Sequence, residues 1–260
     1  MSVRTSGQIE KGSRQFQYLL RLGDDRLVLG HRLSEWCGHA PILEEDIALA
    51  NIALDLIGQA TLLLGHAGKL EGEGRDADTL AYLRDAIEFR NVLLVELPKG
   101  DFAVTIVRQL FFGVFGLLQS EALQRSNDRD LAGIAAKAAK EVRYHVRHSA
   151  DWVLKLGGGT DESRERTQRA VDDLWRYTGE LFLADDVDRA AAAAGVGVDP
   201  STLESRWHSH VEDVLARAGL TIPETLYMQR GGREGRHTEH LGHMLAEMQI
   251  VARSHPGASW

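Results

Sequence analysis

The chain has a single cysteine, Cys37, among its 260 residues. One thiol excludes an intrachain disulfide, a zinc site built on paired cysteines and a thiolate-bound iron–sulfur cluster within this chain. This usage is typical of a protein of the reducing cytoplasm, and we expect a cytoplasmic location. No nucleophile motif surrounds Cys37, so we expect it to pack at a helix end without a chemical role.

Positive charge is not in excess. The chain has 30 Lys and Arg against 38 Asp and Glu, which gives a formal net charge of −8, and the two signs are interleaved along the sequence. Because nucleic-acid binding needs a basic patch or stripe, we expect no nucleic-acid partner.

Long hydrophobic runs and a signal peptide are also missing. The longest apolar run, residues 102–118, is interrupted by Arg108 and Gln109, whereas a bilayer span needs about 20 mostly apolar residues. We interpret the run as a helix buried on every side, and we expect no membrane association. Residues 1–15 are polar and are predicted to form a flexible tail.

Proline is scarce, and its positions define the helices. All five prolines fall between segments whose apolar residues recur at spacings of three and four, and no sustained alternation indicates a strand. The sequence therefore predicts an all-α protein. Helices are expected at about 16–37, 43–67 and 80–89. A long helix is then expected to start with Asp101 as its N-cap, followed by helices at about 130–156, 162–183 and 200–218 and one more near the C-terminus.

Four long helices in two hairpins with one longer crossover are typical of a ferritin-like four-helix bundle. We predict this bundle over residues 16–157 and a helical C-terminal extension over about 160–260. Residues 16–260 would then form a single domain behind the tail.

A di-iron bundle takes one carboxylate from each of two helices and a Glu-x-x-His motif from each of the other two. In the second helix Asn51, Asp55 and Gln59 form an i, i+4, i+8 line. Gly58 stands three residues after Asp55, where a histidine ligand is required. This helix therefore keeps an acid and lacks its imidazole.

The helix at 130–156 departs from the motif in the same way. Glu141 is followed three residues later by Tyr144. His145 comes one residue late, which rotates it by about 100° around the helix. The second half-motif also keeps its acid without a correctly spaced histidine.

Hairpin geometry predicts what the other two helices contribute, because residues equally distant from a tight turn lie at the same height. Asp55 is expected level with about Asp25 or its neighbour Asp24. Glu141 is expected level with about Phe115, within residues 111–115, which hold no ligand. The nearest acid, Glu121, lies about 9 Å further along the helix. The site lacks both histidines and one carboxylate.

Asp25, Asp55, Glu141 and His145 are therefore candidates for a vestigial site. We favour structural roles over metal ligation: a hydrogen-bonded polar seam along the line through Asp55, and a partly buried i, i+4 pair of Glu141 with His145. We expect no catalytic residue, no metal and no cofactor in this chain.

Two further groups could bind ligands. His237, His240 and His243 repeat every three residues with Glu247 one turn on, a spacing that could hold zinc or iron on a helix. We favour exposed histidines at a helix start, because no second ligand group accompanies them. A row of arginines after the GGGTDES segment is interpreted as a solvated face, with substrate phosphates as the alternative: Arg164, Arg166 and Arg169.

A resemblance to a known family rests on long segments in a fixed order, from about Tyr18 to Trp260. The sequence resembles the C-subunit family of bacterial ring-1,2-phenylacetyl-CoA epoxidase, also called phenylacetate-CoA oxygenase. The segments are LRLGDDRLVLGHRLSEWCGHAP, ALANIALDLIGQA, KEVRYHVRHSADWVLKLGGGTDES, LWRYTGELF and HTEHLGHMLAEMQ, with PGASW at the end.

The resemblance implies a ferritin-like subunit of a multicomponent monooxygenase of aerobic phenylacetate catabolism. In that complex the di-iron centre belongs to a related A subunit, and a small B subunit bridges assemblies. A reductase with FAD and an iron–sulfur cluster delivers electrons from NADPH. The C subunit is regarded as the non-catalytic structural partner of the A subunit, and no family metal ligand carries over to Gly58, Tyr144 or residues 111–115.

We therefore expect a structural subunit that is not catalytic by itself and that binds the A subunit through a large apolar interface. Part of the apolar surface of residues 102–118 is expected to belong to that interface. Two alternatives remain: a di-iron oxidase or iron-binding protein with Asp25, Asp55, Glu141 and His145 as ligands, and a helical adaptor unrelated to oxygenation.

Overall fold

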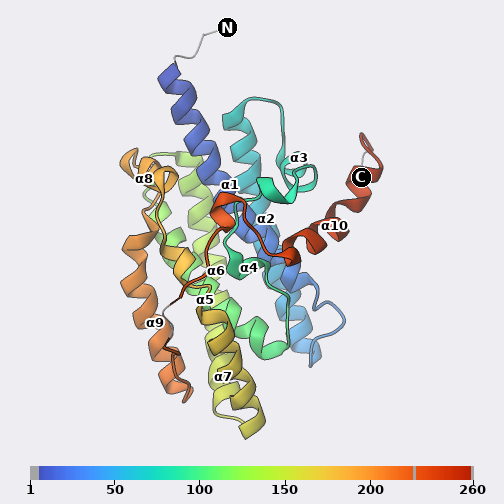
Figure 1. Ribbon diagram of the computed structural model, residues 1–260, viewed down its shortest axis with the longest axis vertical. Coiled ribbons are helices and arrows are strands. Elements are labelled where there is room, and N and C mark those ends of the chain that lie inside the picture. Colours follow the sequence, from blue (N-terminus) through green and yellow to red (C-terminus); the bar gives the residue numbers. More distant parts are fainter. Residues whose placement is uncertain (1–5, 225–226, 259–260) are drawn as a thin grey trace.

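The computed structural model describes residues 6–224 and 227–258, and every regular element in these ranges is a helix. The predicted all-α class is confirmed. Two antiparallel hairpins form the ferritin-like bundle, and α2 of the first lies beside α6 of the second (Figure 1). The hairpins are α1 (Ser6–Ser34) with α2 (Leu43–Glu71), and α5 (Phe102–Leu123) with α6 (Arg129–Gly157).

Helix α5 is the central element of the core. Asp101 caps it as predicted, since its carboxylate accepts a hydrogen bond from the Val104 amide at 3.0 Å. Most of its side chains are buried, including the two polar residues that interrupt the apolar run, Arg108 and Gln109. Burial lowers the pKa of Arg108 to about 10, and its guanidinium donates to the carbonyls of Leu97 and Pro98 at the end of the crossover.

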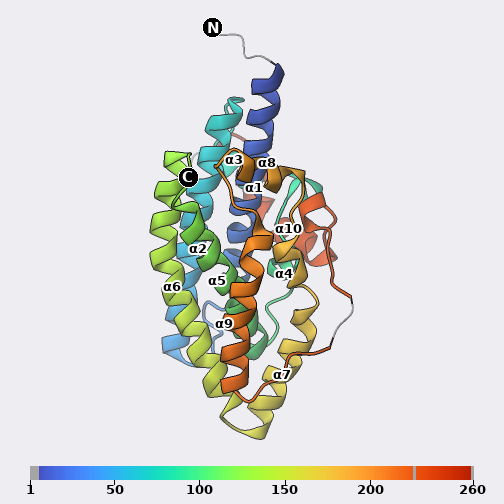
Figure 2. The ribbon, with the colours of Figure 1, turned by 90° about the vertical axis from the view of Figure 1, so that its left-hand side faces the viewer.

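The crossover and the C-terminal extension cover the bundle with short helices. The crossover holds α3 (Ala77–Tyr82), η1 (Ala86–Glu88) and α4 (Leu93–Glu96). The extension holds α7 (Asp161–Trp175), η2 (Gly179–Phe182), α8 (Asp186–Ala193), η3 (Pro200–Leu203), α9 (Glu204–Arg217), η4 (Gly232–Glu234) and α10 (Glu239–Ser254). Helices α7 and α9 flank α5 and α6, whereas α10 packs on the crossover (Figure 2).

Trp207 of α9 fixes the extension to the bundle. It is fully buried, its indole N–H donates to the Phe111 carbonyl at 2.8 Å, and its ring packs edge-on against Phe111 and Phe182. Most of the apolar surface of α5 is buried inside the chain, against α6 and the extension, so less of it is available to a partner than the sequence suggested.

Three element boundaries also differ from the sequence prediction. Helix α1 begins at Ser6, so residues 6–15 continue the helix and the predicted tail is wrong for them; residues 1–5 lie outside the described residues. Adding a turn to an existing helix costs little, because the nucleus is already formed. The helices expected at 80–89 and 162–183 are each broken, the first by the Asp85–Glu88 capping box and the second before Gly179.

Two described helices, α2 and α5, are long and apolar enough to cross a membrane by length and composition alone. Of the most apolar stretch of α5, 83% is buried inside the molecule, as in the core helix of a globular protein. Only 44% of the corresponding stretch of α2 is buried. The outer face of α2 therefore exposes several apolar side chains, among them Leu43, Ile47 and Leu54.

Candidate functional site

The interior of the bundle holds an arginine at the level of Gln59 and Gln119. Arg26 of α1 is 3% exposed, and its guanidinium donates to three acceptors in the interior. They are the Leu22 carbonyl at 2.8 Å, Gln59 Oε1 of α2 at 3.1 Å and Gln119 Oε1 of α5 at 3.3 Å. One fixed positive charge therefore joins three of the four bundle helices.

The fourth helix joins the network through Gln59. The side-chain amide nitrogen of Gln59 donates to Glu141 Oε2 of α6 at 2.8 Å, and Lys137 Nζ lies 3.5 Å from the other carboxylate oxygen of Glu141. Burial lowers the pKa of Arg26, and the neighbouring Asp25 carboxylate opposes that shift. The side chains of Arg26, Gln59 and Glu141 thus form one chain of hydrogen bonds across the bundle.

His145 and Asp55 form a separate contact between α6 and α2. His145 Nε2 lies 3.0 Å from Asp55 Oδ2; the imidazole is 1% exposed and the aspartate 38%. Burial lowers the pKa of His145, and the hydrogen bond to Asp55 partly offsets this. The predicted seam through Asp55 and Gln59 is present, but Asn51 is exposed. The predicted pairing of Glu141 with His145 is wrong, because each has a partner on α2.

Asp25 does not join the other three candidates. Its carboxylate is fully buried on another side of α1, where it accepts from Arg233 at 2.8 and 3.1 Å and from the Val92 amide at 2.8 Å. Asp24 pairs with Arg84 of the crossover. Burial raises the pKa of Asp25, and Arg233 opposes the rise. Both acids hold the crossover and the extension against α1 and are not available to the bundle centre.

A small cavity of about 10 Å³ adjoins the Arg26 guanidinium, enough for about one water molecule. Two buried atoms in its wall, Gln109 Oε1 and His145 Nδ1, have no hydrogen-bond partner among the described residues. None of the described residues that line it is a carboxylate. A di-iron centre needs several carboxylates around two cations, so a guanidinium at this position does not fit one.

The histidine triplet does not assemble either. His237 precedes α10, so the helical spacing that would align it with His240 and His243 is lost. Its ring contacts Glu96 Oε2 at 2.7 Å and the Phe89 carbonyl at 3.0 Å, whereas His243 is exposed. Among the described residues, no group of three or more His, Cys, Asp and Glu side chains is arranged to hold a metal ion.

The arginines of α7 behave as a solvated face. Arg164 and Arg166 are exposed and pair with acids one turn away on the same helix, at 2.5 and 2.8 Å. Arg169 is exposed as well. Exposed pairs of this kind contribute little to stability and enclose no ligand.

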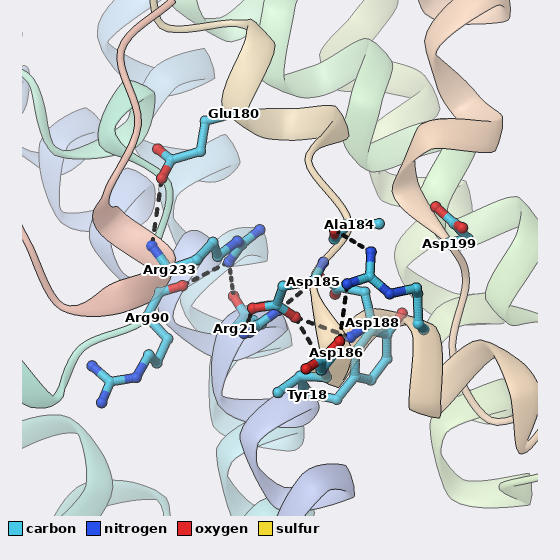
Figure 3. A network of polar contacts seen from close by, with 12 residues as sticks. Tyr18, Arg21, Arg90, Glu180, Ala184, Asp185, Asp186, Asp188, Asp199 and Arg233 are labelled. Carbon is cyan, nitrogen blue, oxygen red and sulfur yellow. Dashed lines mark hydrogen bonds and ion pairs between the residues drawn. The ribbon is translucent and has the colours of Figure 1, made fainter.

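A partly buried ionic network beside α1 was not predicted from the sequence (Figure 3). Arg21 bridges Asp185 and Asp188 of the extension at 2.5 and 2.7 Å. Arg21 holds the pKa of the Asp185 carboxyl well below its ordinary value, although burial opposes this. Glu180 accepts from the backbone amides of Leu93 and Gly231. The network attaches the extension and the crossover to α1. In the sequence, only the acidic helix-capping residues at Asp185 and Asp188 could have indicated it.

Fold and site together define a ferritin-like helical-bundle protein whose centre holds a hydrogen-bonded arginine. The chain belongs to the family described as Phenylacetic acid catabolic protein, which matches residues 3–260. It is 52% identical over 243 residues to the C subunit of 1,2-phenylacetyl-CoA epoxidase from Escherichia coli (strain K12). That alignment covers 94% of this chain and 98% of the relative. The resemblance noted in the sequence is confirmed.

Proposed function

We propose that the chain is a non-catalytic structural subunit of a multicomponent di-iron monooxygenase, one that epoxidises the ring of phenylacetyl-CoA in aerobic phenylacetate catabolism. In this proposal it binds and stabilises a catalytic A subunit, which carries the di-iron centre. A small B subunit and a reductase with FAD, an iron–sulfur cluster and NADPH complete the system in the cytoplasm. The name and 52% identity of the relative support the reaction.

The observation that supports a non-catalytic role most strongly is the Arg26 guanidinium in the bundle interior. It supplies a permanent positive charge and donates to Gln59 and Gln119, so the helices are joined without a metal. A second cation beside it would be repelled, and the repulsion is strong in a poorly screened interior. The residues of this chain hold the bundle together and leave oxygen chemistry to the partner.

The alternative is a di-iron oxidase or iron-binding protein that uses Asp25, Asp55, Glu141 and His145. It would require the Asp25 carboxylate to break its hydrogen bonds to Arg233 and to the Val92 amide, which would leave the buried Arg233 guanidinium without its carboxylate partner. It would also require Arg26 to leave the centre. Breaking a buried ion pair on one side costs about 3–5 kcal/mol, so the geometry favours the structural role.

Co-expression of this chain with the A subunit tests the proposal. We expect the two chains to purify as one complex, iron to remain with the A subunit when the chains are separated, and epoxidation to require both chains and a reductase. Asp55→Asn and Glu141→Gln are expected to leave the iron content of the complex unchanged. Stoichiometric iron on this chain, lost in these variants, would support the alternative. Failure of the two chains to associate would favour an unrelated adaptor.

A further inference from the structure

The small cavity beside Arg26 lies where all four bundle helices meet. Its polar wall holds one residue of each helix, none more than 3% exposed: Arg26 of α1, Gln59 of α2, Gln109 of α5 and His145 of α6. The rest of the wall is apolar and consists of Leu56, Phe112, Gly113, Gly116 and Val142. The volume of about 10 Å³ is close to the smallest that holds one water molecule. A ligand here is therefore about the size of water.

Two buried acceptors in this wall have no donor among the described residues: Gln109 Oε1 and His145 Nδ1. The role of His145 Nδ1 follows from the other ring nitrogen. Nε2 lies 3.0 Å from Asp55 Oδ2, and an ionised carboxylate only accepts, so Nε2 carries the proton and Nδ1 has a lone pair. Burial lowers the pKa of His145, which favours the neutral ring. A buried acceptor without a partner costs free energy, so the cavity favours a molecule that donates twice.

Arg26 limits the charge of that molecule. Its guanidinium has five N–H groups, and three of them donate to protein acceptors. The other two N–H groups can donate to a molecule in the cavity. The fixed positive charge repels a metal ion or ammonium, and a simple anion such as chloride has no hydrogen for Gln109 and His145. A neutral molecule that donates twice and also accepts is required, and at this size that molecule is water.

We propose that the cavity is a binding site for one structural water molecule, which donates to Gln109 Oε1 and His145 Nδ1 and accepts from the Arg26 guanidinium. The water joins α1, α5 and α6, and Gln59 extends the network to α2. It also holds the imidazole with its proton on Nε2, the form that donates to Asp55. The water therefore links the two polar contacts of the bundle interior, one through Arg26 and one through His145. The site needs neither a partner subunit nor the proposed reaction.

Gly116→Ala distinguishes a water site from a dry cavity by the sign of its effect. A Cβ atom added at Gly116 would meet Phe112 Cε1 and Val142 Cγ1 at 3.9 Å, which is ordinary van der Waals contact, and both residues line the cavity. The methyl group therefore fits the chain but occupies space that the water needs. We expect the thermal midpoint to fall, because the displaced water leaves two buried acceptors without a donor. In a dry cavity the same methyl group would raise the midpoint, since alanine is the better helix former and fills a void.

The matched control is Gly58→Ala, in the middle of another bundle helix, where an added Cβ atom meets no described atom within 4 Å. It should raise the midpoint by about 2–4 °C for a chain of this size. A rise of similar size in Gly116→Ala would overturn the water site. Gln109→Met removes one of the two acceptors, and it should be better tolerated in the Gly116→Ala background than in the unsubstituted chain. Equal effects in the two backgrounds would contradict a water that Gly116→Ala displaces from Gln109.

Two structural measurements on the unsubstituted chain complete the test. A high-resolution crystal structure should show one water molecule within about 2.7–3.2 Å of Gln109 Oε1, His145 Nδ1 and an Arg26 nitrogen. Nitrogen-15 NMR should find the His145 proton on Nε2 and a hydrogen-bonded lone pair on Nδ1. A cavity without density, an ion in place of water, or a ring proton on Nδ1 with none on Nε2 would overturn the proposal.

Discussion

Replacing Arg26 by methionine removes the charge at the bundle centre while keeping an unbranched stem of similar shape. The change deletes the hydrogen bonds to the Leu22 carbonyl, Gln59 and Gln119. Gln59 keeps its bond to Glu141, but Gln119 Oε1 loses the donor described for it. The variant therefore isolates the contribution of the guanidinium from that of core volume.

The expected loss follows from two opposing effects. Hydrogen bonds from a charged donor contribute about 1.5–3 kcal/mol each, and an acceptor left buried without a partner costs about 1–3 kcal/mol. Against this, the folded chain no longer has to desolvate a cation, which returns several kcal/mol. We expect a net destabilisation of about 2–4 kcal/mol, or about 5–15 °C in thermal midpoint for a chain of this size.

Thermal unfolding followed by circular dichroism measures this shift, with urea unfolding as a second readout. The matched control is Arg143→Met, also on a bundle helix, whose side chain is 63% exposed and pairs with Glu121 at 3.4 Å; it should change stability by less than about 1 kcal/mol. The double variant Arg26→Met, Gln119→Leu should recover part of the loss. An Arg26→Met chain as stable as the original would refute the claim that the guanidinium holds the bundle centre.

Three further predictions concern other buried groups. Asp25→Asn leaves the Arg233 guanidinium without its full charge partner and should lower the free energy of unfolding by about 3–5 kcal/mol in urea titrations; an unchanged value would contradict a role in attaching the extension. Trp207→Phe loses the N–H bond to Phe111 and should cost about 1–3 kcal/mol, with hydrogen exchange rising in α9 before α1; uniform exchange would count against a local role. Burial lowers the pKa of His145 below its ordinary value of about 6.5. Between the lowered pKa and about 6.5, the unfolded chain therefore binds a proton that the folded chain does not. Stability should fall as pH drops through this window, and an equal slope in His145→Gln would assign it to another group.

The sequence predicted the bundle well, because periodicity and breakers act locally. Helix α6 was expected at 130–156 and spans Arg129–Gly157, and Asp101 caps α5 as expected. The short helices were placed less well. The expected helix at 162–183 ends at Trp175, and the Glu180 carboxylate beyond it accepts amides of Leu93 and Gly231. Contacts across about 50 to 90 residues cannot be read from a local pattern.

The sequence predicted which residue types the candidate site has better than it predicted how their side chains are arranged. The missing histidines at Gly58 and Tyr144 were visible in the sequence. The direction of Asp25 was not, because one residue along a helix is a rotation of about 100°. That rotation turns Arg26 towards the bundle centre and Asp25 towards Arg233. A search for acids and histidines also had no reason to select an arginine, although Arg26 stands beside the apolar segment 27–29.

In the proposed complex with the A subunit, we expect an arginine, and no metal, at the centre of this bundle. A crystal of the complex with the A subunit, measured above and below the iron absorption edge, tests it most directly. We expect anomalous density within the bundle of the A subunit and none in this chain, where the Arg26 guanidinium should contact Gln59 and Gln119. An iron peak among Asp55, Glu141 and His145, with Arg26 displaced, would contradict it.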